Sequence, residues 1–267
     1  MPELMLPNKQ KINYCFYKDK NKPTIVLLHG LGANLSIWQN EFNYFKKKNT
    51  SILIFDLRCH GLSGCYRKPA FKNFSEDIYL LLKKLKIPKA ILAGHSLGGL
   101  ISLDFYRKHP KNVSSLILID SSYNISLKTL KPIFPLEYLL IKIVSYFSRI
   151  RKNKPKHMDF QKFKKSNDLR ILYEANSSLD AARNQNRIIG ELPKIDLSTT
   201  LKKIKVPVLI IGDKNDEFFR IEITRAMAEA IPKSSFHCIN NTHTSILKKP
   251  IQINHLIESF ILENKLI

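Results

Sequence analysis

Short runs of apolar residues alternate along the chain with longer segments in which apolar residues recur at helical spacing. The first pattern predicts buried parallel strands, because strands covered by helices on both faces read as continuous apolar runs. The predicted strands are Glu3–Leu6, Lys11–Phe16, Thr24–Leu28, Ile52–Phe55, Ala90–Ala93, Ser115–Asp120, Val206–Ile211 and Ser234–Ile239. This alternation favours an α/β fold with a mostly parallel sheet and right-handed crossovers.

The helical segments between the strands have recognisable boundaries. Ser75 is a candidate N-cap for the helix before Ala90, and Pro88 ends that helix. A second helix follows Ser96, and a third spans about Pro250–Leu262.

The alternation stops between Asp120 and Val206, and the pattern there is helical. One apolar stripe, about three turns long, consists of Leu136, Leu139, Leu140, Ile143, Val144 and Phe147. Because Glu137 and Lys142 lie inside this run and the run is short, we do not expect it to cross a membrane. We predict a helical cap over residues 121–200, inserted into a core of residues 1–120 and 201–267.

Composition narrows the class of protein. The chain has 267 residues, 44% hydrophobic and 25% charged, which is typical of a globular domain. Its first residues lack the basic and apolar regions of a signal peptide, so we expect no export. The four cysteines at positions 15, 59, 65 and 238 have no metal-ligand spacing, and a chain of this size needs no disulfide framework. We expect a cytoplasmic protein.

The formal net charge is +22, which raises the question of a polyanionic partner. Only 10 of the 44 basic residues are arginine, and the lysines are spread over nearly every segment. This distribution favours a biased genome composition over a binding face, and no nucleic-acid-binding motif is present. We therefore expect no nucleic-acid partner.

A dense basic run lies between residues 149 and 165, where eight lysines and arginines surround the single acid Asp159. We favour a solvated basic face beside the apolar cap helix. The alternative is a patch of the cap that lies on an anionic membrane surface.

The stretch Gly94–Gly99 carries the most specific chemistry. It places Ser96 between Gly94 and Gly98, after an apolar strand and before a helix, which is the G-x-S-x-G pattern of a nucleophile elbow. A serine at such a turn takes a strained backbone conformation, and the glycines let neighbouring chain approach closely. Its hydroxyl is thereby exposed at the positive end of a helix. We therefore predict that Ser96 is a nucleophile.

Two further motifs accompany the elbow: His29–Gly32 reads H-G-L-G, and Asp56–Ser63 reads D-L-R-C-H-G-L-S. With Gly94–Gly99, they resemble the oxyanion loop, conserved turn and elbow of the α/β-hydrolase superfamily, of the serine esterase and lipase type with a cap after the sixth strand. The resemblance spans nearly the whole chain. It implies an eight-stranded, mostly parallel sheet flanked by helices. Cys59 stands where the family usually has glycine.

The resemblance also implies a Ser-acid-His order along the chain. His243 is the candidate base, since it lies after the predicted last strand. In the turn after Ile211 the family's aspartate position is occupied by Asn215, and a one-residue insertion would make Asp216 the acid. Asp213 and Asp120 are the alternatives.

Three other histidines have different expected roles. His237 falls within the last predicted strand and is expected to be packed. His95 matches a family position that supports the elbow, and His29 is expected to shape the oxyanion loop.

This constellation indicates acyl transfer. Ser96 would attack a carbonyl carbon, His243 would take its proton, and the backbone N–H groups of Leu31 and Leu97 would bind the oxyanion. We expect a carboxylic ester hydrolase with a small-molecule ester substrate and with no metal, nucleotide or flavin. Lipase activity on a monoacylglycerol or lysophospholipid, carbon–carbon bond hydrolysis and a non-catalytic ligand sensor are the alternatives on the same fold.

Overall fold

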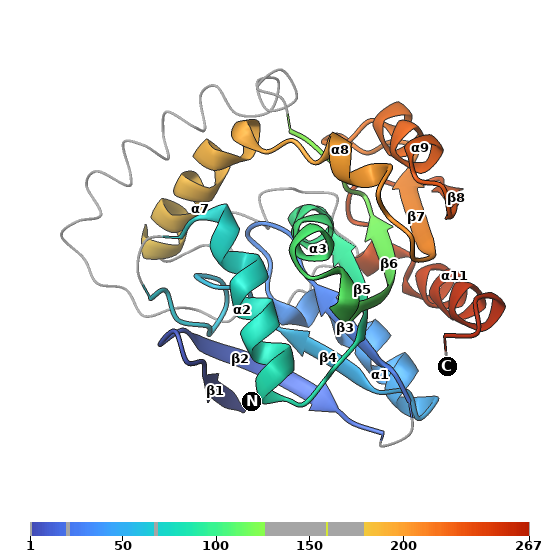
Figure 1. Cartoon of the computed structure of the whole chain (residues 1–267). Coiled ribbons are helices and arrows are strands. Elements are labelled where there is room, and N and C mark those ends of the chain that lie inside the picture. The colour runs from blue at the N-terminus through green and yellow to red at the C-terminus, as the bar shows by residue number, and fades with distance from the viewer. Residues whose placement is uncertain (1, 20–21, 67–68, 126–158, 160–178, 267) are drawn as a thin grey trace.

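One mixed sheet forms the centre of the molecule. The computed structural model describes residues 2–19, 22–66, 69–125, 159 and 179–266. The eight strands in the described residues follow the order β1-β2-β4-β3-β5-β6-β7-β8, and only the β1/β2 and β2/β4 pairs are antiparallel (Figure 1). The strands are β1 (Glu3–Met5), β2 (Lys11–Tyr17), β3 (Thr24–Leu28), β4 (Ile52–Phe55), β5 (Ala90–His95), β6 (Val113–Ile119), β7 (Val208–Asp213) and β8 (Ser234–Ile239). The predicted mostly parallel, eight-stranded sheet is confirmed.

Helices cover both faces of this sheet. The α-helices are α1 (Gln39–Lys47), α2 (Phe71–Lys84), α3 (Leu97–Lys108), α7 (Leu179–Glu191), α8 (Ser198–Leu201), α9 (Ile221–Ala230), α10 (Ser245–Lys248) and α11 (Pro250–Glu263). Buried side chains of α2, α3 and α9 belong to one apolar core, and those of α1 and α11 belong to the other. Figure 1 shows α2 and α3 in front of the sheet.

The central parallel strands are mainly apolar because their side chains enter both cores. In β3, Val26 and Leu28 enter the core with α2 and α3, whereas Ile25 and Leu27 enter the core with α1 and α11. All four side chains are fully buried. Alternate residues of a strand point to opposite faces, so a strand covered on both faces has no polar position.

The start of α2 differs from the sequence prediction. The helix begins at Phe71, four residues before the predicted cap Ser75. Glu191, at the end of α7, accepts a hydrogen bond from the Phe71 N–H at 2.6 Å, and Asn73 accepts one from the Ala70 N–H at 3.1 Å. Ser75 instead lies inside the helix. The sequence suggested that Ser75 caps the start of this helix, whereas in the structure Glu191, which is distant along the chain, binds the N–H group there.

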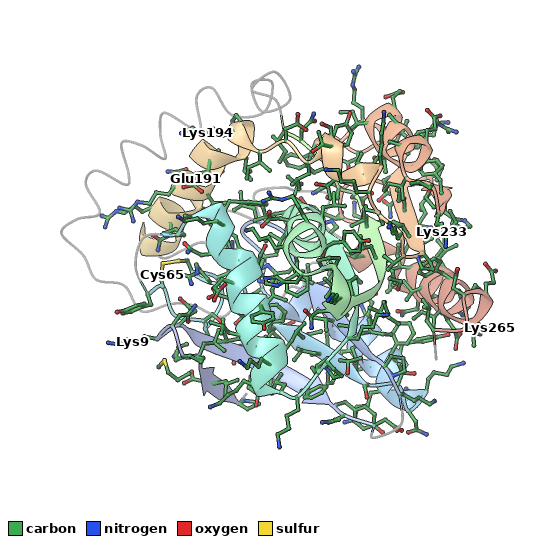
Figure 2. The ribbon with its side chains drawn as sticks, viewed as in Figure 1. Lys9, Cys65, Glu191, Lys194, Lys233 and Lys265 are labelled. Atoms are coloured by element: carbon green, nitrogen blue, oxygen red, sulfur yellow. A yellow bond between two sulfur atoms is a disulfide. The ribbon has the colours of Figure 1, made fainter. Side chains whose placement is uncertain are left out.

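Part of the predicted cap lies outside the described residues. The apolar stripe of residues 136–147 and, apart from Asp159, the basic run of residues 149–165 fall there. Within the described part of residues 121–200, α7 is helical, and its carboxyl end touches α2 through Glu191 (Figure 2). The cap boundaries stay a prediction. No helix among the described residues is long and apolar enough to cross a membrane.

The turn after β4 is held by buried charged groups. The Asp56 carboxylate accepts hydrogen bonds from the Leu35 and Leu62 N–H groups, each at 2.8 Å, and from the Asn13 amide at 2.7 Å. Arg58 forms a buried ion pair with Asp77 of α2 at 2.7 Å. These contacts fix the turn against both the sheet and a helix.

A disulfide within the same turn was not expected from the sequence. It joins Cys59 and Cys65, whose Cα atoms are 4.4 Å apart (Figure 2). Cys59 has φ 63°, a left-handed conformation that glycine adopts more easily, which explains why the family usually has glycine there. Because disulfides persist mainly in oxidising compartments, this bond is less typical of the cytoplasm, and the cytoplasmic location stays a prediction.

Breaking the disulfide should lower the free energy of unfolding. We expect Cys65→Ser to cost about 2 kcal/mol, since the crosslink restricts a short loop of the unfolded chain. Urea unfolding without reductant measures this change. The matched control is Cys238→Ser, at an exposed free cysteine, which should change stability by less than about 0.5 kcal/mol. Identical unfolding of the oxidised and reduced wild-type protein would contradict the expectation.

Candidate active site

Ser96 occupies a sharp turn between β5 and α3. Its backbone has φ 55° and ψ −119°, and its N–H donates a hydrogen bond to the Ile119 carbonyl at 3.0 Å. Within Ala90–Leu100, Ser96 is the one residue that is not fully buried. The strand and helix are therefore sealed in the core while the serine side chain stays accessible.

The glycines of the elbow are required by close backbone contacts. A Cβ on Gly94 would lie 2.3 Å from the backbone carbon of Gly98. A Cβ on Gly98 would lie 2.2 Å from the carbonyl oxygen of Leu28, at the end of β3. Any side chain at either position would push α3 away from the strand ends, which explains the G-x-S-x-G spacing in physical terms.

The structure brings Ser96, His243 and Asp216 into one hydrogen-bonded row. His243 Nδ1 lies 2.8 Å from Asp216 Oδ2, and His243 Nε2 lies 3.0 Å from Ser96 Oγ. Since an ionised carboxylate only accepts hydrogen bonds, Nδ1 carries the proton and Nε2 is free to accept one from the serine hydroxyl. A serine beside an oriented imidazole is an activated nucleophile.

The Asp216 carboxylate is held by its own turn. Its Oδ1 atom accepts hydrogen bonds from the N–H groups of Phe218 at 2.7 Å and Phe219 at 2.9 Å. Both aromatic rings also lie against His243, with ring centroids 4.7 and 5.7 Å away. The turn thus orients the acid and shields its contact with the imidazole. This contribution of Phe218 and Phe219 was missed from the sequence, although both residues directly follow the candidate acid.

The two alternative acids do not bind the His243 ring. Asp120 Oδ1 accepts a hydrogen bond from the Asp213 N–H at 3.0 Å, and Asp120 Oδ2 accepts one from the Ser245 hydroxyl at 2.9 Å. Asp213 is buried, and its carboxylate oxygens have no hydrogen-bond partner among the described residues.

Burial and crowding raise the pKa of both carboxyl groups. Burial first, and then the neighbouring Asp213 carboxylate, raise the pKa of Asp120 well above its ordinary value. Burial is also the largest cause of the raised pKa of Asp213. Of Asp120, Asp213 and Asp216, only Asp216 contacts the His243 ring.

His95 and Ser245 anchor the loop that carries His243. His95 Nε2 donates a hydrogen bond to the His243 carbonyl oxygen at 2.8 Å, and burial lowers the pKa of His95 to about 3, so the ring is neutral. Ser245 ties the same loop to Asp120. The supporting position expected for His95 thus has a specific contact. Ser245 was missed, because nothing in its local sequence indicates a distant acidic partner.

The loop after β3 lies directly against the elbow. A Cβ on Gly30 would lie 3.1 Å from Ser96 Cβ, so the loop approaches the serine closely. His29 shapes this loop, since its Nδ1–H donates to the Gly30 carbonyl at 2.8 Å and its Nε2 accepts from the Leu57 N–H at 2.9 Å. Leu31 follows Gly30, and Leu97 is the first residue of α3.

The prediction for His237 was wrong. It lies in β8 as expected, but its side chain is exposed. The reason is that β8 is the edge strand of the sheet, where the cover by helices is incomplete.

One cluster in the site has residue types that can bind a metal. Ligand atoms of His95, Asp120 and His243 all lie within 4.8 Å of one another. Each of these residues already has a protein partner: His95 binds the His243 carbonyl, Asp120 binds Ser245, and His243 binds Asp216 and Ser96. Hydrogen bonding therefore accounts for their proximity.

These observations define an α/β hydrolase: a mostly parallel sheet, a serine at a strand-to-helix elbow, and an imidazole beside it. Comparison with family models agrees, since the model described as "Serine aminopeptidase, S33" matches residues 19–246. The chain belongs to this family of α/β hydrolases.

Individual relatives are distant. The chain is 24% identical over 263 residues to 3-oxoadipate enol-lactonase 2 of Acinetobacter baylyi, covering 93% of this chain and 92% of that protein. Among solved structures, it resembles a carboxylesterase structure from Nitrososphaera gargenis with a TM-score of 0.79 and 21% identity, covering 99% of both chains. An esterase from Exiguobacterium antarcticum gives a TM-score of 0.76 at 22% identity, covering 97% of this chain and 98% of the other. At these identities the solved structures show the shared fold.

The raised pKa of Asp120 predicts a pH-dependent effect of its substitution. A group whose pKa is raised on folding stabilises the protein fully below its unfolded pKa of about 4, and this contribution is lost as the pH rises through the folded value. The variant Asp120→Asn has no carboxyl group at this position, so its stability does not fall in this way as the pH rises. Asparagine also tolerates the left-handed backbone of this position, where φ is 46°. We therefore expect the variant to gain stability relative to wild type between pH 4 and pH 8.

Denaturant unfolding at several pH values measures this gain. The exposed Asp196 is the control, because the N–H of Ser198 lowers the pKa of its carboxyl group. Asp196→Asn should therefore differ from wild type by a nearly constant amount between about pH 5 and pH 8, because the stabilisation from a lowered pKa is complete above the unfolded value of about 4. A difference between Asp120→Asn and wild type that stays constant with pH would show that Asp120 ionises normally in the folded protein.

Proposed function

We propose that this protein is a serine hydrolase that cleaves carboxylic esters through an acyl-enzyme intermediate. The observation that carries the proposal is the row of contacts from Ser96 Oγ to His243 Nε2 at 3.0 Å and from His243 Nδ1 to Asp216 at 2.8 Å. These are the distances at which a general base takes a proton from a nucleophile.

In the proposed reaction, Ser96 Oγ attacks the ester carbonyl carbon while its proton passes to His243 Nε2. Asp216 holds the imidazole in the required tautomer and stabilises its positive charge. The tetrahedral intermediate collapses as His243 gives the proton to the departing alcohol oxygen. Water, deprotonated by His243, then attacks the acyl-enzyme, and His243 gives that proton to Ser96 Oγ as the acyl–oxygen bond breaks, which releases the carboxylic acid and free Ser96.

We assign the oxyanion hole to the backbone N–H groups of Leu31 and Leu97. The contact of Gly30 with Ser96 supports Leu31, and the place of Leu97 at the start of α3 supports the second donor. Losing one such donor typically costs about 2.7–4 kcal/mol of transition-state stabilisation.

The substrate class is inferred from the chemistry of the site and of the relatives. The names of similar proteins include an enol-lactonase and esterases, and a lactone is a cyclic ester, so both activities break an acyl–oxygen bond. We therefore propose a small-molecule carboxylic ester. A lipase that uses its cap at a membrane surface is the alternative within the same chemistry. Carbon–carbon bond hydrolysis and ligand sensing are the alternatives on the same fold, and turnover of esters would distinguish the proposed activity from both.

Substitutions in the proposed triad should abolish turnover. We expect Ser96→Ala and Asp216→Asn each to lower kcat on p-nitrophenyl acetate by roughly 10⁴-fold or more, because the nucleophile or the correct imidazole tautomer is lost. The matched control is Asp213→Asn in the same turn, which should retain activity within a few-fold. Steady-state kinetics of the folded variants shows which of the two aspartates is required for turnover. Loss of activity in Asp213→Asn with survival in Asp216→Asn would reverse the assignment of the acid.

Acyl chain length should separate esterase from lipase. For an esterase we expect kcat/KM to be highest on short p-nitrophenyl esters and to fall toward the palmitate ester. A steep rise toward long chains with activity on micelles would instead support the lipase. If folded wild-type protein turned over no ester in the series, the ester-hydrolase proposal would be wrong.

A further inference from the structure

Lysines gather at the end of the sheet opposite the candidate active site. The parallel strands from β3 to β8 all begin at this end, and helices α1, α2, α3 and α9 end there before the chain enters the next strand. Helix α11 also runs back to this end after β8. Each of these chain segments brings an exposed lysine. We define the basic end by six exposed lysines: Lys47, Lys84, Lys111, Lys233 and Lys265 from these segments, and Lys203 from the connection between α8 and β7.

The connections at the opposite end of the described sheet carry fewer cations, and the one after β8 adds Lys248 and Lys249. The connections after β3 and β5 carry no Lys, Arg, Asp or Glu before the next helix begins. The connection after β7 carries Lys214 and Arg220 together with Asp216 and Glu217. Lysine is therefore not spread evenly over the described surface, as a composition bias alone would require.

Helix dipoles explain only part of this asymmetry. Lys47 and Lys84 are the last residues of α1 and α2, where a cation is stabilised by the carboxyl end of the helix. Lys233 lies three residues beyond the end of α9, and this effect is confined to the last turn of a helix. The known ion pairs at this end use Lys48, Arg107 and Lys108, none of which is among the six.

The chemistry of the basic end fits lipid better than nucleic acid. Open aromatic faces that stack on bases are typical of single-stranded nucleic-acid sites, whereas lysine clusters without such faces are typical of surfaces that bind anionic lipid. The rings of Tyr17 and Tyr44 are already covered by Lys46 and Lys48 ammonium groups, at 5.8 and 5.5 Å from the ring centroids.

An apolar side chain accompanies the charges. Leu262 is 64% exposed near the carboxyl end of α11, three residues before Lys265 (Figure 2 labels Lys265). It lies one turn beyond Glu258, which contacts the end of α1 through Tyr44 at 2.6 Å and Lys48 at 3.0 Å. An exposed leucine among lysines suits a membrane interface, where apolar side chains enter the lipid and cations bind the headgroups.

We propose that the basic end docks on the surface of a bilayer that contains anionic phospholipid, with the candidate active site facing the opposite direction. This surface is distinct from the basic run of the cap. The proposal does not depend on ester hydrolysis.

Vesicle co-sedimentation of the full chain tests the proposal. We expect binding to phosphatidylcholine vesicles that contain phosphatidylserine, weakened by salt, and no binding to phosphatidylcholine alone. The variant Lys47→Glu/Lys84→Glu/Lys233→Glu should bind at least about tenfold more weakly. The matched control, Lys72→Glu/Lys194→Glu/Lys249→Glu, makes the same charge change at three exposed lysines away from the basic end, at the starts of α2 and α11 and just after α7, and should bind within about twofold of wild type.

Several results would overturn the proposal. They are equal loss of binding in both triple variants, no effect of the basic-end variant, absence of binding to anionic vesicles, or equal binding to neutral vesicles. Displacement from anionic vesicles by a single-stranded oligonucleotide at a lower concentration than soluble phosphatidylserine headgroup would identify nucleic acid as the partner instead. Circular dichroism melting, together with hydrolysis of p-nitrophenyl acetate, shows whether each variant is folded, so lost binding can be separated from lost structure.

Discussion

The left-handed backbone of Ser96 is the constraint on which the candidate site depends. A non-glycine residue with φ 55° and ψ −119° carries about 1–3 kcal/mol of conformational strain, so the surrounding contacts must offset it. The Ser96 N–H bonds to the Ile119 carbonyl, and Gly98 lets α3 approach the end of β3. The packed strand and helix thus hold a hydroxyl in a position that the chain would not adopt alone.

The partners of Ser96 come from loops and are fixed from several directions. The His95 side chain binds the main-chain carbonyl of His243, and the Asp120 carboxyl group binds the Ser245 hydroxyl two residues further on. The Asp216 turn is closed by its own N–H groups. Rigid elements therefore position Ser96, while hydrogen bonds between loops position His243 and Asp216. A loss of these polar contacts would affect reaction geometry before it affected the sheet.

Much of the fold and part of the site could be read from the sequence. Strands such as Thr24–Leu28 were evident because burial on both faces favours apolar residues, and the elbow was evident because close packing allows only glycine at positions 94 and 98. The cap of α2 and the exposure of His237 depend on which elements meet in space or lie at the sheet edge, which no local pattern records. The disulfide was missed for the same reason, since only the folded turn shows that the two cysteines meet.

The disulfide turn also reaches the elbow through one side chain. Leu57, two residues before Cys59, donates its N–H to His29, and His29 bonds to Gly30 beside Ser96. The oxidation state of Cys59 and Cys65 in a preparation therefore has to be known before any rate constant measured for this protein is interpreted. Protein purified from a reducing cell extract and protein secreted into an oxidising medium are different chemical species, and their kinetics can be compared only after the oxidation state of Cys65 has been determined.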